Sequence, residues 1–221
     1  ANIYRSWLDG VAFVNTSTWT VVKVVPGPQG SICGGAYWRD IKTYQHYCYV
    51  SSECTGTNQG IMIIDLQYLP DSVHYIKSFA PAGDIRSHNI SIDTVKGFLY
   101  AVKQNYSGFR AISLASPANP VEVFTTVTGD LHDIFAHNDT VYAAEGNNHA
   151  FSIWNLAIKT SPQQLARIVI PAGGYVHNIW PTMDKRYVAT TEETSFKTVK
   201  FWDIQNLANI QLKSQFLAPS N

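Results

Sequence analysis

Short apolar runs separated by turn residues fill this chain from end to end. β-Branched and aromatic residues dominate the runs, and proline, glycine, asparagine and aspartate lie between them. No stretch shows the period of about 3.6 residues that is typical of an amphipathic helix. The pattern therefore predicts an all-β protein.

One short motif recurs: His or Arg, then Asp or Asn, then Ile. Its four copies end at Ile41, Ile90, Ile134 and Ile179, which are 49, 44 and 45 residues apart. A second apolar run with a tyrosine follows each copy, at Tyr49, Tyr100, Tyr142 and Tyr187. A period of about 40–50 residues with several short strands per period is the signature of a β-propeller.

Two further apolar runs complete each period. Third strands are expected at 11–15, 61–65, 109–113, 151–155 and 199–203, and fourth strands at 20–25, 73–79, 121–127, 166–170 and 211–216. Each period thus predicts one four-stranded antiparallel blade, about five repeat units are visible, and the first lacks its opening strand. We expect residues 1–221 to form a single propeller domain. Either the units close imperfectly, or the chain is part of a longer propeller, or a second chain completes the ring.

Composition and charge indicate a folded protein and argue against some classes of binding partner. Hydrophobic residues make up 45% of the chain and charged residues 14%, so a folded core is expected. The formal net charge is zero, and no basic run is present that could follow a phosphate backbone, which argues against nucleic acid. No apolar segment approaches the roughly 20 residues of a membrane span.

The low charge and the many Asn, Ser, Thr and aromatic residues are more typical of an extracellular or cell-surface protein than of a cytosolic one. Three cysteines are present; a disulfide between Cys33 and Cys54 is one alternative, with Cys48 buried, and three reduced thiols are the other. Sequons at Asn15, Asn89, Asn105 and Asn138 would carry glycans only in a eukaryotic source.

Three segments resemble the repeat of the choice-of-anchor B family of LVIVD-repeat β-propellers: residues 38–42, 49–53 and 60–66. Residues 87–90 and 116–121 fit the same pattern, so the similarity covers nearly the whole chain. The resemblance implies a secreted or surface-exposed propeller with no established catalytic activity. Members of that family tend to be longer and carry a C-terminal anchor, and no anchor follows Asn221.

Three histidines share one place in the repeat, at the start of the innermost strand: His88, His132 and His177. Equivalent positions in a propeller fall on a circle around the central channel, so the imidazoles could hold a Zn or Cu ion. They could instead bridge neighbouring blades by hydrogen bonds, or take part in ligand binding or proton transfer. Arg39 replaces histidine in the first copy, and its positive charge opposes metal binding.

Other polar groups are expected near this ring. Asp40, Asn89, Asp133 and Asn178 lie one residue further on, so they should point the other way, toward the loops or a hard cation such as Ca²⁺. Glu53, Glu145, Glu192 and Glu193 follow second strands; they are either solvated loop carboxylates or groups that line the channel mouth. Tyr37, Trp38, Tyr175 and Trp180 could form a platform for carbohydrate, although packing inside the protein is the alternative for Trp38 and Trp180.

The sequence contains no Gly-x-Ser-x-Gly motif and no phosphate-binding loop, and no spacing pairs one Ser with one His. The leading functional prediction is therefore an extracellular scaffold without catalytic activity, which binds a protein or glycan through the loops at the histidine-bearing end. The alternative is a metalloprotein, or an enzyme, with its ion on the channel axis.

Overall fold

The structure is a computed structural model, and it describes residues 10–28, 39–80, 86–102, 108–125 and 129–217. Eighteen strands and no helix occur in these residues, so the prediction of an all-β protein is confirmed. The same ranges contain no helix of the length and apolar character needed to cross a membrane.

Every sheet is antiparallel and built from strands that follow one another in the sequence. A two-stranded hairpin comes first and consists of β1 (Gly10–Asn15) and β2 (Thr20–Pro26). The first four-stranded sheet has β3 (Ile41–Tyr44), β4 (Tyr47–Val50), β5 (Ile61–Asp65) and β6 (His74–Phe79). The second has β7 (Asn89–Asp93), β8 (Phe98–Val102), β9 (Phe109–Ser113) and β10 (Val121–Thr125).

The third sheet has β11 (Asp133–His137), β12 (Thr140–Glu145), β13 (Ala150–Asn155) and β14 (Gln163–Val169). The fourth has β15 (Val176–Pro181), β16 (Tyr187–Glu192), β17 (Val199–Asp203) and β18 (Gln211–Phe216). The expected four-stranded repeats are therefore present, and the first repeat unit is represented by its third and fourth strands.

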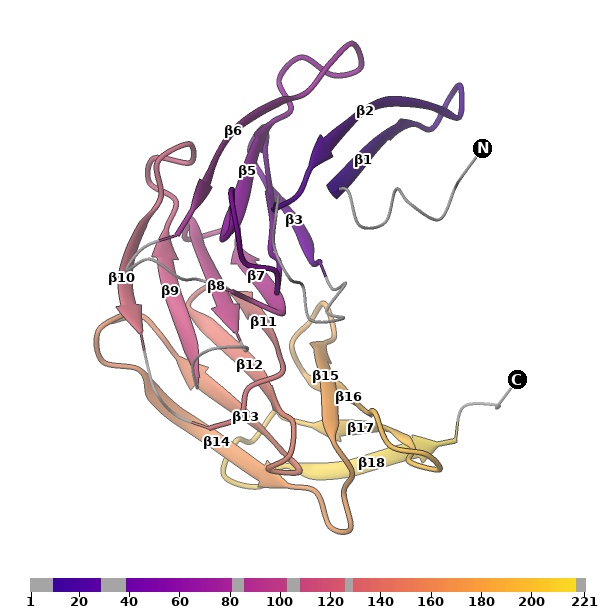
Figure 1. Ribbon diagram of the computed structural model, residues 1–221. Coiled ribbons are helices and arrows are strands. Elements are labelled where there is room, and N and C mark those ends of the chain that lie inside the picture. The colour runs from indigo at the N-terminus through magenta and orange to yellow at the C-terminus, as the bar shows by residue number, and fades with distance from the viewer. Residues whose placement is uncertain (1–9, 29–38, 81–85, 103–107, 126–128, 218–221) are drawn as a thin grey trace.

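The sheets follow one another around an arc, as the blades of a propeller do (Figure 1). The first strand of each sheet lies on the inner side, where β7 packs beside β3 and β11, and β11 packs beside β15. The hairpin β1–β2 and the sheet of β15–β18 lie at opposite ends of the arc (Figure 1). The inner strands of the four complete sheets thus form a common hub.

The core is divided into layers, one between each pair of neighbouring sheets. Strand β8 shows how the sequence produces this arrangement: Leu99 and Ala101 pack toward the first four-stranded sheet, whereas Tyr100 and Val102 pack toward the third. Successive side chains of a strand point to opposite faces, so an unbroken apolar run can bury both faces of its sheet. This explains the short continuous apolar runs of the sequence.

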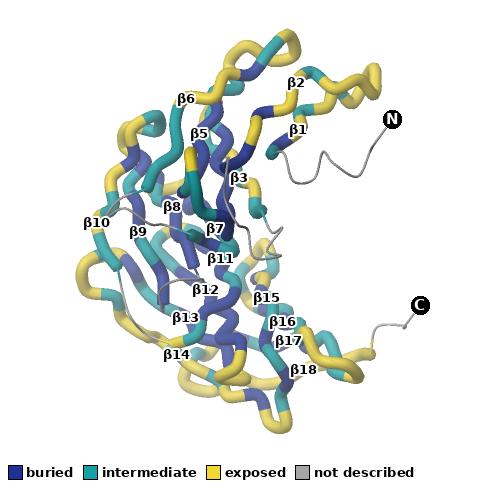
Figure 2. The backbone as a smooth tube through the Cα atoms, in the orientation of Figure 1, coloured by how far each residue is buried: buried dark blue, intermediate teal, exposed yellow. Residues whose placement is uncertain are grey.

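Burial falls off at the outer strands and at the ends of the arc (Figure 2). Every residue of β18 is exposed, in contrast to β5, of which only Asp65 is not buried. In the hairpin, Val14 and Val21 are 47% and 59% exposed. Within the described residues, the two end sheets are thus covered on one face only.

Candidate functional site

A cavity of about 380 Å³ lies at the hub, and all four inner strands contribute to it. Its lining consists of Asp40, Lys42, His88, Asn89, His132, Asp133, Ile134, His177, Asn178, Trp180 and Glu193. The three repeated histidines and the residue that follows each of them therefore meet in one place, although they are far apart in the sequence. The expectation that equivalent positions of the repeats lie around a common centre is supported by this lining.

The three histidine rings lie in a row with His132 in the middle, each tilted relative to the next. Its ring centroid lies 4.4 Å from that of His88 and 4.3 Å from that of His177. Tyr175 contacts the edge of the same imidazole, with ring centroids 5.2 Å apart. The middle ring, His132, is the most buried of the three, whereas the side chains of His88 and His177 are 14% and 40% exposed.

Two of the histidines bridge neighbouring sheets by hydrogen bonds. Nδ1 of His132 donates to the backbone carbonyl of His177, at 2.8 Å. Nδ1 of His88 lies 2.7 Å from Oε1 of Glu53, a carboxylate that is almost fully buried. The predicted hydrogen bonds between neighbouring blades are therefore present in the structure.

Asp40, Asn89, Asp133 and Asn178 also line the cavity, so the expectation that they point away from the histidines is wrong. His88 and His132 precede their strands, and in β15 a bulge between Val176 and Asn178 interrupts the alternation of side chains. Strict two-residue alternation therefore does not apply at these positions.

Each of these residues connects its sheet to a neighbouring one. Oδ2 of Asp40 accepts a hydrogen bond from the backbone of Ile90 at 3.0 Å. The amide of Asn89 donates to the carbonyl of His132 at 3.3 Å, and the amide of Asn178 donates to the carboxylate of Asp133. These contacts link neighbouring sheets at the hub.

Burial raises the pKa of Asp133 to about 6, against the opposing effect of a hydrogen bond from the backbone of Ile134. The negative charge of Asp40 raises it further, whereas Lys42 and His88 lower it. Lys42 supplies the one ammonium group among the lining residues, and it lies 2.5 Å from Asp40. Lys42 was not among the predicted site residues, although it lies only two residues after Asp40, at the second position of β3.

Three of the four predicted carboxylates lie outside the cavity lining and are paired elsewhere. Glu53 bonds to His88, Glu145 lies 2.8 Å from Arg167, and Glu192 pairs with Lys200. Only Glu193 reaches the cavity, where its Oε2 lies 3.7 Å from Nε2 of His177. Glu193 is the solvated carboxylate of the set, with 66% of its side chain exposed.

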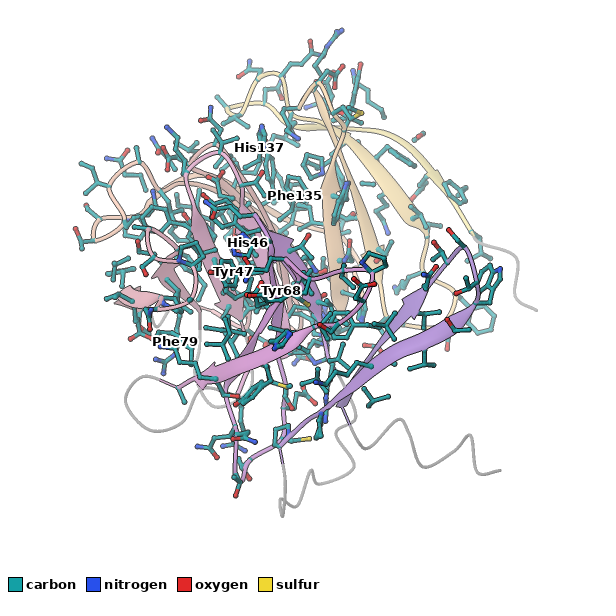
Figure 3. All side chains as sticks on the ribbon, turned by 90° about the horizontal axis from the view of Figure 1, so that it is seen from above. His46, Tyr47, Tyr68, Phe79, Phe135 and His137 are labelled. Atoms are coloured by element: carbon teal, nitrogen blue, oxygen red, sulfur yellow. The ribbon has the colours of Figure 1, made fainter. Side chains whose placement is uncertain are left out.

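The aromatic residues are divided between the cavity and the core. Trp180 lines the cavity with 55% of its surface exposed, so the interpretation of this residue as buried packing is wrong. It packs edge-on against Phe135 of β11, at 4.6 Å between ring centroids, and Figure 3 shows Phe135 from above. Tyr37 and Trp38 lie outside the described residues.

The remaining predicted residues lie away from the cavity. Arg39 is outside its lining, and its guanidinium approaches Cys54 Sγ at 3.8 Å. Cys54 is disulfide-bonded and Cys48 is a buried free thiol, whereas Cys33 lies outside the described residues, so the Cys33–Cys54 pairing stays a prediction.

The sequons differ in their surroundings. Asn89 is engaged in the hub, Asn15 accepts hydrogen bonds from the backbone of Ser17 and Thr18, and Asn138 lies in the turn between β11 and β12. Asn105 lies outside the described residues.

No family model matches the chain, and no curated protein matches it. The resemblance to the choice-of-anchor B family therefore gains no support. Solved structures do match. One is the periplasmic gluconolactonase PpgL of Pseudomonas aeruginosa, at 14% identity and a TM-score of 0.69, over 96% of this chain and 64% of that one.

Two further structures show the same likeness. A candidate 6-phosphogluconolactonase of Bacteroides fragilis matches at 12% identity and a TM-score of 0.65, over 91% of this chain and 62% of that one. A functionally unknown protein of Desulfotomaculum acetoxidans matches at 17% identity and a TM-score of 0.67, over 94% and 62%. The likeness shows a propeller-like fold, and the chain spans less than two thirds of each neighbour's length.

These neighbours correct the functional prediction. Structures that share this fold carry the names of lactonases, which are enzymes, so the prediction of a scaffold without catalytic activity is not upheld. That prediction took the lack of a nucleophile motif as evidence against catalysis. Hydrolysis by an activated water needs no such motif, because proton acceptors and charge from separate strands suffice.

Proposed function

We propose that the chain is a hydrolase that opens a small polar ester, with sugar lactones as the substrate class. The observation that carries the proposal is the hub cavity of about 380 Å³, in which imidazoles, carboxylates and one ammonium group converge. A volume of this order is that of a small-molecule site. The names of the gluconolactonase neighbours supply the class of ester.

The chemistry of lactone opening fits this lining. Water adds to the carbonyl carbon and loses a proton, the tetrahedral oxyanion collapses, and the ring C–O bond breaks as the ring oxygen takes up a proton. The step needs a proton acceptor, a donor and a positive group near the oxyanion. Imidazole and carboxylate groups provide the first two, and Lys42 provides the positive charge.

Trp180 and the two asparagines give the cavity features that suit a sugar. The half-exposed indole of Trp180 offers an apolar face, and the amides of Asn89 and Asn178 offer polar groups beside it. Such a mixture of one aromatic surface and a few polar groups orients a small ligand.

We also propose that the protein works outside the cytoplasm. The disulfide at Cys54 is typical of an oxidising compartment. The Pseudomonas aeruginosa neighbour is periplasmic by name.

The test is acid release from glucono-δ-lactone, followed with a pH indicator and corrected for the uncatalysed rate. We expect Lys42→Ala to lower kcat about 10-fold or more, because it removes charge from the transition state. Trp180→Ala should mainly raise KM. The control is Lys23→Ala, at an exposed position of β2, which should behave as the wild type. Rates equal to the uncatalysed reaction for the wild type would refute the proposal.

A further inference from the structure

Only one group of residues in the described part of the chain brings three metal-binding side chains together: His132, His177 and Glu193. Their ligand atoms all lie within 4.8 Å of one another. We propose that this group binds a divalent transition-metal ion of the Zn²⁺ type. The set differs from the three equivalent histidines of the repeat, because Glu193 takes the place of His88.

The three ligand atoms lie within 4.8 Å of one another, so they must move closer together to hold one ion. Two ligands of a tetrahedral Zn²⁺ ion, each bonded at about 2.0–2.1 Å, lie roughly 3.3 Å apart. Nε2 of His177 and Oε2 of Glu193 are 3.7 Å apart. The side chain of Glu193 is 66% exposed, so it can turn inward without disturbing the core, whereas His132 is buried and held in place.

The hydrogen bond of His132 prepares it as a ligand. Its Nδ1 donates a proton to the carbonyl of His177, so in the neutral ring Nε2 carries a lone pair and no proton. Metal-bound histidines usually donate their other ring N–H to a carbonyl or carboxylate, which fixes both the tautomer and the orientation of the ring. The hydrogen bond from Nδ1 of His132 to the carbonyl of His177 fixes the ring in this way without an ion.

Charge and ligand type also favour this ion. The cavity lining contains three carboxylates, from Asp40, Asp133 and Glu193, against the single ammonium of Lys42. Two imidazoles and one carboxylate form a set that Zn²⁺ accepts with one position left for water, whereas Ca²⁺ takes about 6–8 oxygen ligands. The site therefore selects a transition metal over calcium.

The experiment uses the whole chain, stripped with EDTA and dialysed. Zn²⁺ is titrated by calorimetry, and Co²⁺ is titrated by visible absorption, whose intensity reports a tetrahedral site. We expect one saturable ion per chain, and we expect Glu193→Gln, His177→Ala and His132→Ala each to weaken binding at least about 10-fold, since even the loss of an outer partner costs about 10–100-fold. His46→Ala is the control, because this half-exposed imidazole lies in the β3–β4 turn, beside Tyr47 (Figure 3).

Glu193→Gln keeps the test decisive even if a histidine variant unfolds, because the exposed carboxylate contributes little to the core. Absence of saturable Zn²⁺ binding overturns the proposal, as does binding that is unchanged in both Glu193→Gln and His177→Ala. Calcium that competes equally with Zn²⁺ also overturns it. The proposal stands apart from lactone hydrolysis, because the readout is the ion itself and not turnover.

Discussion

The imidazole of His132 donates a hydrogen bond from Nδ1 to the backbone carbonyl of His177, 45 residues later and in the next sheet. The donor belongs to a buried side chain and the acceptor to the backbone. Replacing His132 therefore removes the bond, whereas replacing His177 leaves its carbonyl in place.

We expect His132→Ala to lower the free energy of unfolding by about 2–4 kcal/mol, because a buried ring and its hydrogen bond are lost together. His177→Ala should cost less than half as much, since it removes a partly exposed ring only. Urea unfolding of the metal-free proteins measures both. Equal costs for the two variants would show that the inter-sheet bond contributes nothing.

Asp93 is a second link between sheets, and it is completely buried. Its Oδ2 accepts from the backbone of Asp139 at 2.7 Å, and its Oδ1 accepts from Val95 and Lys96. Asp93→Ala leaves these donors without an acceptor, so we expect a loss of about 2–4 kcal/mol. Thermal unfolding should show a lower Tm, with exposed Asp71→Ala as the matched control.

Burial raises the pKa of the Cys48 thiol to about 11. The thiolate is the reactive form, so iodoacetamide should leave Cys48 unmodified in the folded protein at pH 8 and label it readily in urea. Intact-mass spectrometry counts the added groups. One adduct per chain under native conditions would contradict the burial of this thiol.

Asp133 should make stability fall as the pH rises. Its folded pKa, about 6, lies above its ordinary value of 3.8, so the folded state binds the proton more tightly than the unfolded state does. This stabilisation is complete below about pH 4 and is lost as the pH rises through about 6. Asp40 raises the pKa of Asp133 further, whereas Lys42 and His88 lower it.

The Asp133→Asn variant should lack this dependence. We expect the stability of the wild type relative to Asp133→Asn to decrease by about 1–3 kcal/mol between pH 4 and pH 7. Urea unfolding across this range, with EDTA present, measures the difference. A difference that stays constant with pH would show that Asp133 titrates normally.

Much of the strand pattern could be predicted from the sequence, because each blade repeats the same apolar runs. The fourth strand expected at 211–216 coincides with β18. The meeting of His88, His132 and His177 at one hub could also be predicted. Repeats that fold alike place equivalent residues at the same distance from the centre of the propeller.

The pairing of individual side chains and the local irregularities of the strands could not be predicted from the sequence. The bulge in β15 depends on how Val176 and Asn178 pair with β16, which no periodicity reveals. Glu145 and Glu192 look like Glu193 in the sequence, yet each of the first two pairs with a cation of its own sheet. Glu145 pairs with Arg167, two strands away on β14, and Glu192 pairs with Lys200 on the adjacent strand β17. Trp180 is exposed because it lines the hub cavity, and hydrophobicity alone does not tell which aromatic residues line a cavity.

The polar contacts at the hub run from each sheet to the one after it, through Asp40 to Ile90, Asn89 to His132, and Asp133 to Asn178. Each repeat of about 45 residues therefore contains the residue that forms the hydrogen bond to the next repeat. Two of these contacts end on a backbone group, which any following repeat would supply, whereas the third needs an aspartate facing an asparagine. A whole repeat could therefore be duplicated or deleted at the first two junctions without loss of the polar contact, but the same change at the third would separate Asp133 from Asn178.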